Sequence, residues 1–472
     1  MSKPLTLNGN FSDLVGKLYL PIGLTIVFLG SLSGLIFLGT IKEYAYITFA
    51  IFAVIPLLYL MVRYPRIWIY LIALTNIYFF YEREKEVSFM EIILAIQYLG
   101  SVGFWMLWMV FVKREKIIHN IADLFILFFL IIVLANSVIG YLNSNDMYYW
   151  IRESFNLLLL SIYFPVRKYF SEKKHLITLL IIYSIVVTTS ACLHFYTYTR
   201  ILQGDIHYAY ELMKGIRVNQ TLFTAAAVFG FIFALYNQKK FISILLTLFT
   251  SIAIIGLVTS FSRTFWVILL AELIIVIFYL SGKQKIKLLI YTTLTTILIL
   301  VTMFYVFEDK SKVMLQLIEN RFVSTGRGTK DISVQARFVE YKQVLKGIEE
   351  YPMAGNGLSD VIVYWNSLES YTTRVRFIHN GYLYIMYKLG IPALFVCFFP
   401  FVYFLIKGER FARKETDEFY RILCVGSFMA IILMFVSNFT AAQISSREAM
   451  FVTALSFAFI GIVMEKKKLN EV

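Results

Sequence analysis

The sequence has little charge and few cysteines, and each shortage excludes a class of protein. Charged residues make up 16% of the 472 residues, whereas a soluble globular domain carries about 25%, so an ordinary soluble fold is excluded. The three cysteines all lie in apolar stretches and give neither a disulfide framework nor the spacing of a zinc site. No Asp-x-Asp pair is present to hold a divalent ion. We therefore expect no metal and no other cofactor.

What is present is apolar: hydrophobic residues make up 59% of the chain. Apolar runs of about 18–25 residues recur, each long enough to cross a hydrocarbon core about 30 Å thick. We predict an all-α polytopic membrane protein with about 12–14 transmembrane helices and one large extracytoplasmic loop that carries short helices. The predicted spans are residues 18–38, 44–62, 66–81, 89–112, 121–141, 149–166, 175–198, 219–236, 241–259, 264–281, 286–307, 380–406, 420–438 and 447–464.

Lysine and arginine cluster in alternate connections, which places both termini on the cytoplasmic side of a bacterial cytoplasmic (inner) membrane. The net charge of +14 then reflects orientation, so we expect no nucleic-acid partner. We divide the chain into N-terminal transmembrane helices (1–200), a second membrane region (201–464) and a basic cytoplasmic tail (465–472). The largest outer connection, 308–379, is expected to cap the outer surface, with an amphipathic helix at 333–349.

Several spans begin with arginine at the predicted outer face, where positive residues are uncommon and a cation opposes the helix dipole. For Arg152 and Arg447, each followed by a glutamate, snorkelling or pairing with that acid is a sufficient account. Arg217 and Arg263 have no acid within a few positions, so a bound anion is the better account. Since the arginine fork suits phosphate oxygens, we predict an outward-facing diphosphate site. The second-tier candidates around it are Arg152, Arg376, Arg447, Asn219, Asn380 and Ser262.

The stretch "RFIHNGYLYIMYKLGIP" (376–392) places His379 at the start of a predicted span. An imidazole titrates near neutral pH and can act as a general base toward a hydroxyl. The alternative is a histidine that only caps the helix or lies at the membrane interface. Glu272 lies mid-span, about 12 Å beyond the helix start, so we expect it to be structural, either paired or protonated.

Three segments carry a family resemblance: "TSFSRTFWVILLAELI", "QARFVEYKQVLKGIEEYPMAGNGL" and "IHNGYLYIMYKLGIPALF". Together they resemble the O-antigen ligase and polymerase family of bacterial membrane glycosyltransferases, over roughly residues 215–400. The resemblance implies a glycan donor carried on undecaprenyl diphosphate, transferred to an acceptor sugar with inversion and without a metal. By position, Arg217, Arg263 and Arg337 would bind the diphosphate, and His379 would lie at the acceptor hydroxyl.

The expected function is therefore an O-antigen ligase-like, metal-independent inverting glycosyltransferase, acting at the outer face of the membrane in surface polysaccharide or lipopolysaccharide assembly. Its expected partners are the undecaprenyl-diphosphate-linked donor, a glycan or glycolipid acceptor, and membrane lipid. One alternative is a polymerase of the same family that extends lipid-linked repeat units. Another is a flippase for the lipid-linked oligosaccharide, although a transporter often has related halves and a midplane site.

Overall fold

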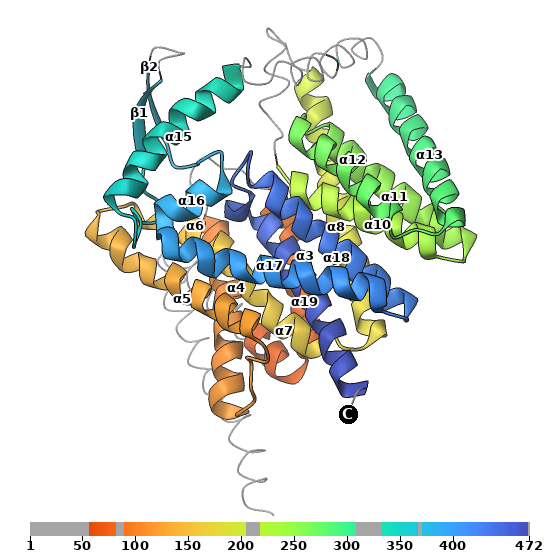
Figure 1. Cartoon of the computed structure of the whole chain (residues 1–472), viewed down its shortest axis with the longest axis horizontal. Helices are drawn as coiled ribbons and strands as arrows, with labels where there is room; N and C mark the ends of the chain where they lie inside the picture. The colour runs from red at the N-terminus through yellow and green to blue at the C-terminus, as the bar shows by residue number, and fades with distance from the viewer. Residues whose placement is uncertain are drawn as a thin grey trace, which may run out of the picture.

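The computed structural model describes residues 56–81, 89–203, 218–307, 319, 332–366 and 371–470. The predicted span 18–38, most of 44–62 and Arg217 lie outside these residues. Most of the described chain is helical (Figure 1). They are α3 (Pro65–Tyr81), α4 (Phe89–Leu107), α5 (Ile121–Leu142), α6 (Met147–Leu158), α7 (Tyr163–Tyr169), α8 (Lys173–Gln203), α10 (Gln220–Tyr236), α11 (Lys240–Val258), α12 (Arg263–Ile277), α13 (Gly282–Phe307), α15 (Ile332–Glu350), α16 (Gly381–Leu389), α17 (Ile391–Lys414), α18 (Glu418–Ser437) and α19 (Arg447–Asn470).

The prediction of an all-α polytopic membrane protein is confirmed. Within the described residues, seven helices are long and apolar enough to cross a membrane, and the segments Tyr98–Val112 and Gln220–Tyr236 are shorter apolar helices. From 66–81 onward, each predicted span coincides with helical structure. The helix predicted at 333–349 is α15. The loop also contains a β-hairpin that the sequence did not predict.

Two predicted spans are wrong as single helices. The span 380–406 breaks into α16 and α17 at Gly390, whose φ of +92° favours glycine. A Cβ on Gly390 would lie 2.2 Å from the carbonyl oxygen of Met353, so the loop before the hairpin occupies that space. The span 149–166 consists of α6, a 3₁₀ turn (Leu159–Ile162) and α7. Pro165 explains this second break, since it lacks the N–H that would continue the helix.

The starts of α10, α12, α16 and α19 lie at one end of the bundle, which we call the loop end because α15 and the hairpin lie there, beside α16 (Figure 1). These helix starts come together because the antiparallel neighbours α11 and α18 end beside them. Three hydrogen bonds show the arrangement: the Gly381 amide to the Asn438 carbonyl (2.7 Å), the Thr221 hydroxyl to the Gln443 side chain (2.7 Å), and the Trp266 indole to the Leu257 carbonyl (3.2 Å).

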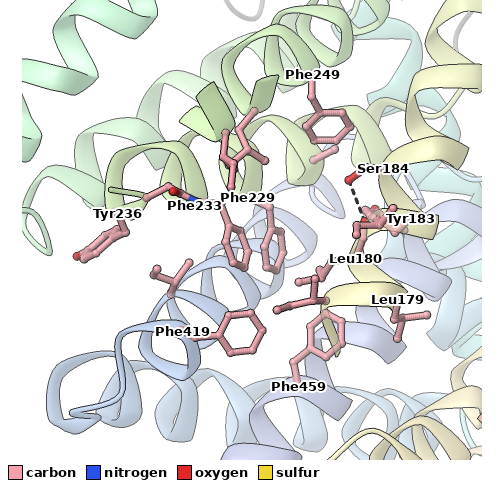
Figure 2. A pocket seen from close by; sticks show the side chains of 18 of the residues that line it. Leu179, Leu180, Tyr183, Ser184, Phe229, Phe233, Tyr236, Phe249, Phe419 and Phe459 are labelled. Carbon is pink, nitrogen blue, oxygen red and sulfur yellow. Dashed lines mark hydrogen bonds between the residues drawn. The ribbon is translucent and has the colours of Figure 1, made fainter. Parts of the chain in front are cut away.

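An apolar cavity of about 850 Å³ lies between α8, α10, α11, α18 and α19. Aromatic side chains from several of these helices face it, among them Phe229, Phe233 and Phe419 (Figure 2). The cavity lies toward the opposite end of the bundle, where α19 ends, which we call the tail end.

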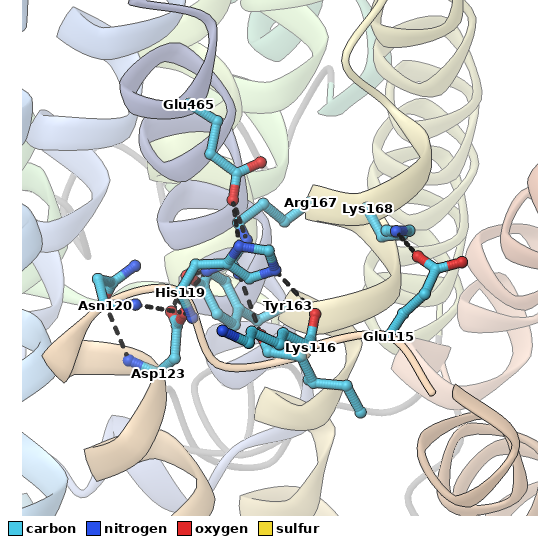
Figure 3. Close-up of polar contacts among 10 residues, drawn as sticks. Glu115, Lys116, His119, Asn120, Asp123, Tyr163, Arg167, Lys168 and Glu465 are labelled. Carbon is cyan, nitrogen blue, oxygen red and sulfur yellow. Dashed lines mark hydrogen bonds and ion pairs between the residues drawn. The ribbon is translucent and has the colours of Figure 1, made fainter. Parts of the chain in front are cut away.

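A buried ion-pair network joins α5, α7 and α19 at the tail end (Figure 3). Nη1 of Arg167 lies 2.6 Å from Asp123 and its Nε lies 3.1 Å from Glu465. Asp123 also accepts the His119 amide at 2.6 Å and forms a capping box with Asn120 at the start of α5. Arg167 is only 4% exposed, so its charge is a structural partner for acids inside the bundle.

Candidate active site at the loop end

The segment after α15 is tied to the end of α16 by backbone hydrogen bonds. The amides of Asn356 and Gly357 donate to the carbonyls of Tyr387 and Lys388, at 2.8 and 3.0 Å. These carbonyls lie in the last turn of α16, where a helix leaves its carbonyl groups without internal partners. The loop therefore caps α16 and fixes the position of α15 relative to that helix.

Two asparagines of α5 and the following turn hold the same segment from another side. The Asn136 side chain accepts the Leu358 amide at 2.7 Å and donates to the Lys388 carbonyl at 3.2 Å. Asn145 donates to the carbonyls of Asn356 and Leu358 at 3.2 and 3.0 Å. Each amide side chain supplies the donor or acceptor that the loop backbone lacks, so the loop is held in one conformation.

The chain then forms the hairpin of β1 (Ile362–Asn366) and β2 (Tyr371–Val375), which pair antiparallel with Ile362 opposite Val375. β1 packs on α15, and β2 leads directly into the segment that contains His379. The hairpin thus returns the chain from the loop to the start of α16, beneath α15 (Figure 1).

His379 lies just before α16 and is held by Glu340 of α15 through two contacts. The backbone N–H of His379 donates to Oε1 of Glu340 at 2.7 Å, and its Nδ1 lies 2.8 Å from Oε2. The Glu340 side chain is 3% exposed, whereas the imidazole is 42% exposed. An ionised carboxylate only accepts hydrogen bonds, so Nδ1 carries the proton in this arrangement. In the neutral form of the ring, Nε2 then has a free electron pair and can accept a proton from a hydroxyl.

Tyr341 and Arg337 lie on the same stretch of α15 as Glu340. The Tyr341 hydroxyl donates to the His379 carbonyl at 2.8 Å. Burial raises the pKa of Tyr341, and the nearby positive charge of Arg337 only partly offsets this, so the hydroxyl stays a donor at neutral pH. Arg337 is partly buried and lies one turn before Glu340 and Tyr341. The structure therefore brings two sequence-predicted residues, Arg337 and His379, to the contact between α15 and the start of α16.

Asn380 is the N-cap of α16. Its side chain accepts the amides of Tyr382 and Leu383 at 2.9 and 3.0 Å, which satisfies two of the free N–H groups at the helix start. The next residue, Gly381, packs against the end of α18 so closely that a Cβ would lie 1.9 Å from Oδ1 of Asn438. These contacts fix where the helix begins, and hence where His379 stands.

Arg376 is engaged by structural partners. Its guanidinium lies 3.9 Å from the centre of the Tyr149 ring, and its Nη2 lies 4.0 Å from Asp146. Its Nε donates to the Ser359 carbonyl at 3.3 Å. These contacts attach the end of the hairpin to the start of α6, and a second-tier role for Arg376 toward substrate stays a prediction.

Most of the other predicted residues lie at the starts of other helices. Arg263 is the first residue of α12 and Ser262 is its N-cap residue, whereas Asn219 is the N-cap residue of α10, with a φ of +60°. Arg447, 8% exposed, begins α19 and donates to the Asn156 side chain at 3.2 Å. α12, which begins with Arg263, packs against α10, α11 and α18, whereas α15, which contacts His379, packs against α16 and β1. Arg152 lies within α6 and is partly buried.

Lys388 was not among the predicted residues. It is fully buried on α16, donates to the Asp360 carbonyl at 2.7 Å and lies 3.7 Å from Glu153. Glu153 also accepts the Ser359 amide at 2.9 Å. Glu153 therefore neutralises a buried lysine in a neighbouring helix. The available signal was a single lysine inside an apolar helix, since such a charge requires a buried partner.

Glu272 is 1% exposed on α12, and neither of its carboxyl oxygens has a hydrogen-bond partner among the described residues. The sequence predicted a structural glutamate that is either paired or protonated. An unpaired carboxylate is costly at this depth, so the arrangement favours the protonated form.

Residues 246–398 match the family model described as O-Antigen ligase. The matched segment includes α12, α15, the hairpin and α16, and so contains Arg263, Arg337 and His379. The match confirms the resemblance seen in the sequence. Among curated proteins, none matches the chain.

Proposed function

We propose that this chain, whose residues 246–398 form a region of the O-antigen ligase family, transfers a glycan from a lipid diphosphate to an acceptor hydroxyl at the loop end. The family match supports a membrane enzyme of polysaccharide assembly with ligase or polymerase activity. The observation that carries the finer proposal is the contact of Glu340 with both the backbone and Nδ1 of His379. A histidine that only caps the helix would need neither a buried carboxylate beside Nδ1 nor an imidazole ring that is partly exposed to solvent.

In the proposed reaction, Nε2 of His379 takes the proton of the acceptor hydroxyl as its oxygen attacks the anomeric carbon of the donor. The new carbon–oxygen bond forms as the bond from that carbon to the diphosphate breaks on the opposite face, so the configuration inverts. The electron pair of the broken bond leaves with the diphosphate. Glu340 stabilises the imidazolium that forms, since its carboxylate lies 2.8 Å from Nδ1.

Arginine charge stabilises the diphosphate in this proposal. Arg337 lies near the contacts of His379, because it shares a face of α15 with Glu340 and Tyr341. Arg263 begins α12 at the loop end, where free N–H groups of the helix start add donors to an anion. Arg217 is proposed with them from its place in the sequence. With positive charge supplied by side chains, the proposed step uses no metal.

We further propose that the loop end faces outward from the bacterial cytoplasmic membrane and that both termini are cytoplasmic, as the distribution of lysine and arginine indicates. The donor is then an undecaprenyl-diphosphate-linked glycan in the outer leaflet, and the acceptor is a glycan or glycolipid.

The test uses the full-length chain purified into vesicles with a lipid-linked glycan donor and a candidate acceptor. We expect His379→Ala and Arg263→Ala each to lower the transfer rate at least 100-fold. The matched controls are His175→Ala and Arg410→Ala at the tail end, which should keep the wild-type rate. Wild-type rates in both loop-end variants would overturn the site assignment.

The products of the same reaction separate the two family activities. A single addition to a separate acceptor indicates a ligase, whereas a ladder of lengths indicates a polymerase that extends lipid-linked units. Donor moved across the bilayer with no new glycosidic bond would show a flippase and overturn the proposal.

A further inference from the structure

The tail-end cavity is large enough for a lipid. An apolar cavity of about 150 Å³ stays dry and holds one benzene molecule, so the volume of about 850 Å³ holds on the order of 30 carbon atoms. Two acyl chains of a phospholipid contain about this number of carbon atoms. The phenylalanine rings that line it are Phe229, Phe233, Phe249, Phe419 and Phe459 (Figure 2).

Between α8, α10 and α11, the cavity is closed toward the loop end. A Cβ on Gly256 of α11 would lie 3.0 Å from the Phe223 ring of α10 and 3.1 Å from Ala191 of α8, so these three helices touch directly above the cavity. On α8, the lining residues fall between Lys173 and Ser184, in the tail-end part of the helix. This contact separates the cavity from the loop end between α8, α10 and α11. Because the charged lining residues lie at the tail end, we expect the occupant to enter there.

The tail-end mouth of the cavity carries charges of both signs. Its polar residues are Lys173, Asn237, Gln238, Asp417 and Glu418. Lys173 is exposed, with its Nζ 4.9 Å from the centre of the Phe419 ring, at the rim of the apolar wall. Asp417 is already engaged as the N-cap of α18, whereas Glu418 is exposed. An ammonium and a carboxylate at one rim complement a headgroup that carries a phosphate and an amine.

We infer that this cavity binds one two-chain phospholipid with an amine-bearing headgroup of the ethanolamine type. The acyl chains fill the space between α8, α10, α11, α18 and α19, the phosphate lies at Lys173 and the amine at Glu418. The lipid belongs to the leaflet at the tail end, opposite the proposed glycan-transfer site. It fills a void that would otherwise leave five helices poorly packed.

The experiment measures lipid retention by native mass spectrometry. The full-length chain is extracted in mild detergent from vesicles that contain equal amounts of phosphatidylethanolamine and phosphatidylglycerol. We expect one phosphatidylethanolamine per chain. The double variant Leu180→Trp/Leu246→Trp fills the cavity and should lower retention at least 10-fold. Leu245→Trp adds the same ring to the exposed face of α11 and should retain the lipid.

A second pair of variants tests the mouth without altering the packing. Lys173→Glu should lower retention about 10-fold, whereas Lys174→Glu, an exposed neighbour that does not line the cavity, should not. Equal retention by Lys173→Glu and Lys174→Glu would overturn the inference, even if the double tryptophan variant does not fold. Preferential retention of phosphatidylglycerol, or of a prenyl lipid in chain prepared from cells, would overturn it as well.

Discussion

Replacing Glu340 by glutamine should move the proton of the neutral His379 ring from Nδ1 to Nε2, the nitrogen proposed to act as the base. The backbone N–H of His379 can only donate, and it lies 2.7 Å from Oε1 of residue 340. Glutamine must therefore turn its oxygen toward that amide, which leaves its NH₂ group facing Nδ1. Two donors cannot face each other, so Nδ1 gives up its proton and Nε2 carries one instead. The nitrogen proposed to accept the acceptor's proton is then already protonated.

The expected loss follows from the role of the base. General-base catalysis contributes about 10²–10⁴-fold, and each tenfold change in rate is about 1.4 kcal/mol of activation free energy. We therefore expect Glu340→Gln to lower kcat by about 10²–10⁴-fold with little change in KM. Stability should change much less, by about 1 kcal/mol, because both hydrogen bonds to His379 are retained.

The assay measures initial transfer rates from a lipid-linked donor in vesicles, with the thermal unfolding of the same preparation as a second reading. Glu349→Gln is the matched control, since it makes the same change at an exposed position on α15. A kcat within threefold of wild type would refute the argument that Glu340 sets the tautomer. A fall in activity matched by an equal loss of folded protein would refute it too.

Three further substitutions test the frame around the site. Gly390→Ala places a Cβ 2.2 Å from the Met353 carbonyl oxygen at a φ of +92°. The resulting strain of at least about 1–3 kcal/mol should lower the midpoint of thermal unfolding and abolish glycan transfer. An unchanged midpoint would contradict the helix break seen at Gly390. Asp123→Ala removes the carboxylate that lies 2.6 Å from the buried Arg167 and should lower the free energy of unfolding by about 3–5 kcal/mol. A change under about 1 kcal/mol would show that Glu465 alone is a sufficient partner for Arg167. Glu272→Gln resembles the protonated acid and should leave stability within about 1 kcal/mol and activity unchanged; a large loss would mean that the carboxylate is ionised and bound.

The helices could be predicted because the bilayer demands long apolar runs, and runs such as those of α5 and α19 stand out against their polar flanks. The helix break at Gly390 was missed because hydropathy averaged over the length of a span does not reveal the effect of one residue. The local sequence "GIP" contained the signal, since glycine often ends a helix and proline favours the first turn of the next.

The residues of the site were predictable only in part. His379 and Arg337 could be singled out because their types suit the chemistry and they lie in the segments that carry the resemblance. Glu340 could not, because 39 residues separate it from His379 and only the packing of α15 on α16 brings them together. For the same reason, no local pattern indicates that Arg376 contacts Asp146 and Tyr149 of a distant segment.

The backbone bonds between the loop and α16 bear on how variants of this protein can be built. The amides of Asn356 and Gly357 complete the last turn of α16, so the loop and this helix should exchange their amide hydrogens as one cooperative unit. A chimaera that takes its loop from a relative but keeps this α16 would join two halves of one folding unit. Donor or acceptor preference should therefore be transplanted as a single block from α15 through α16.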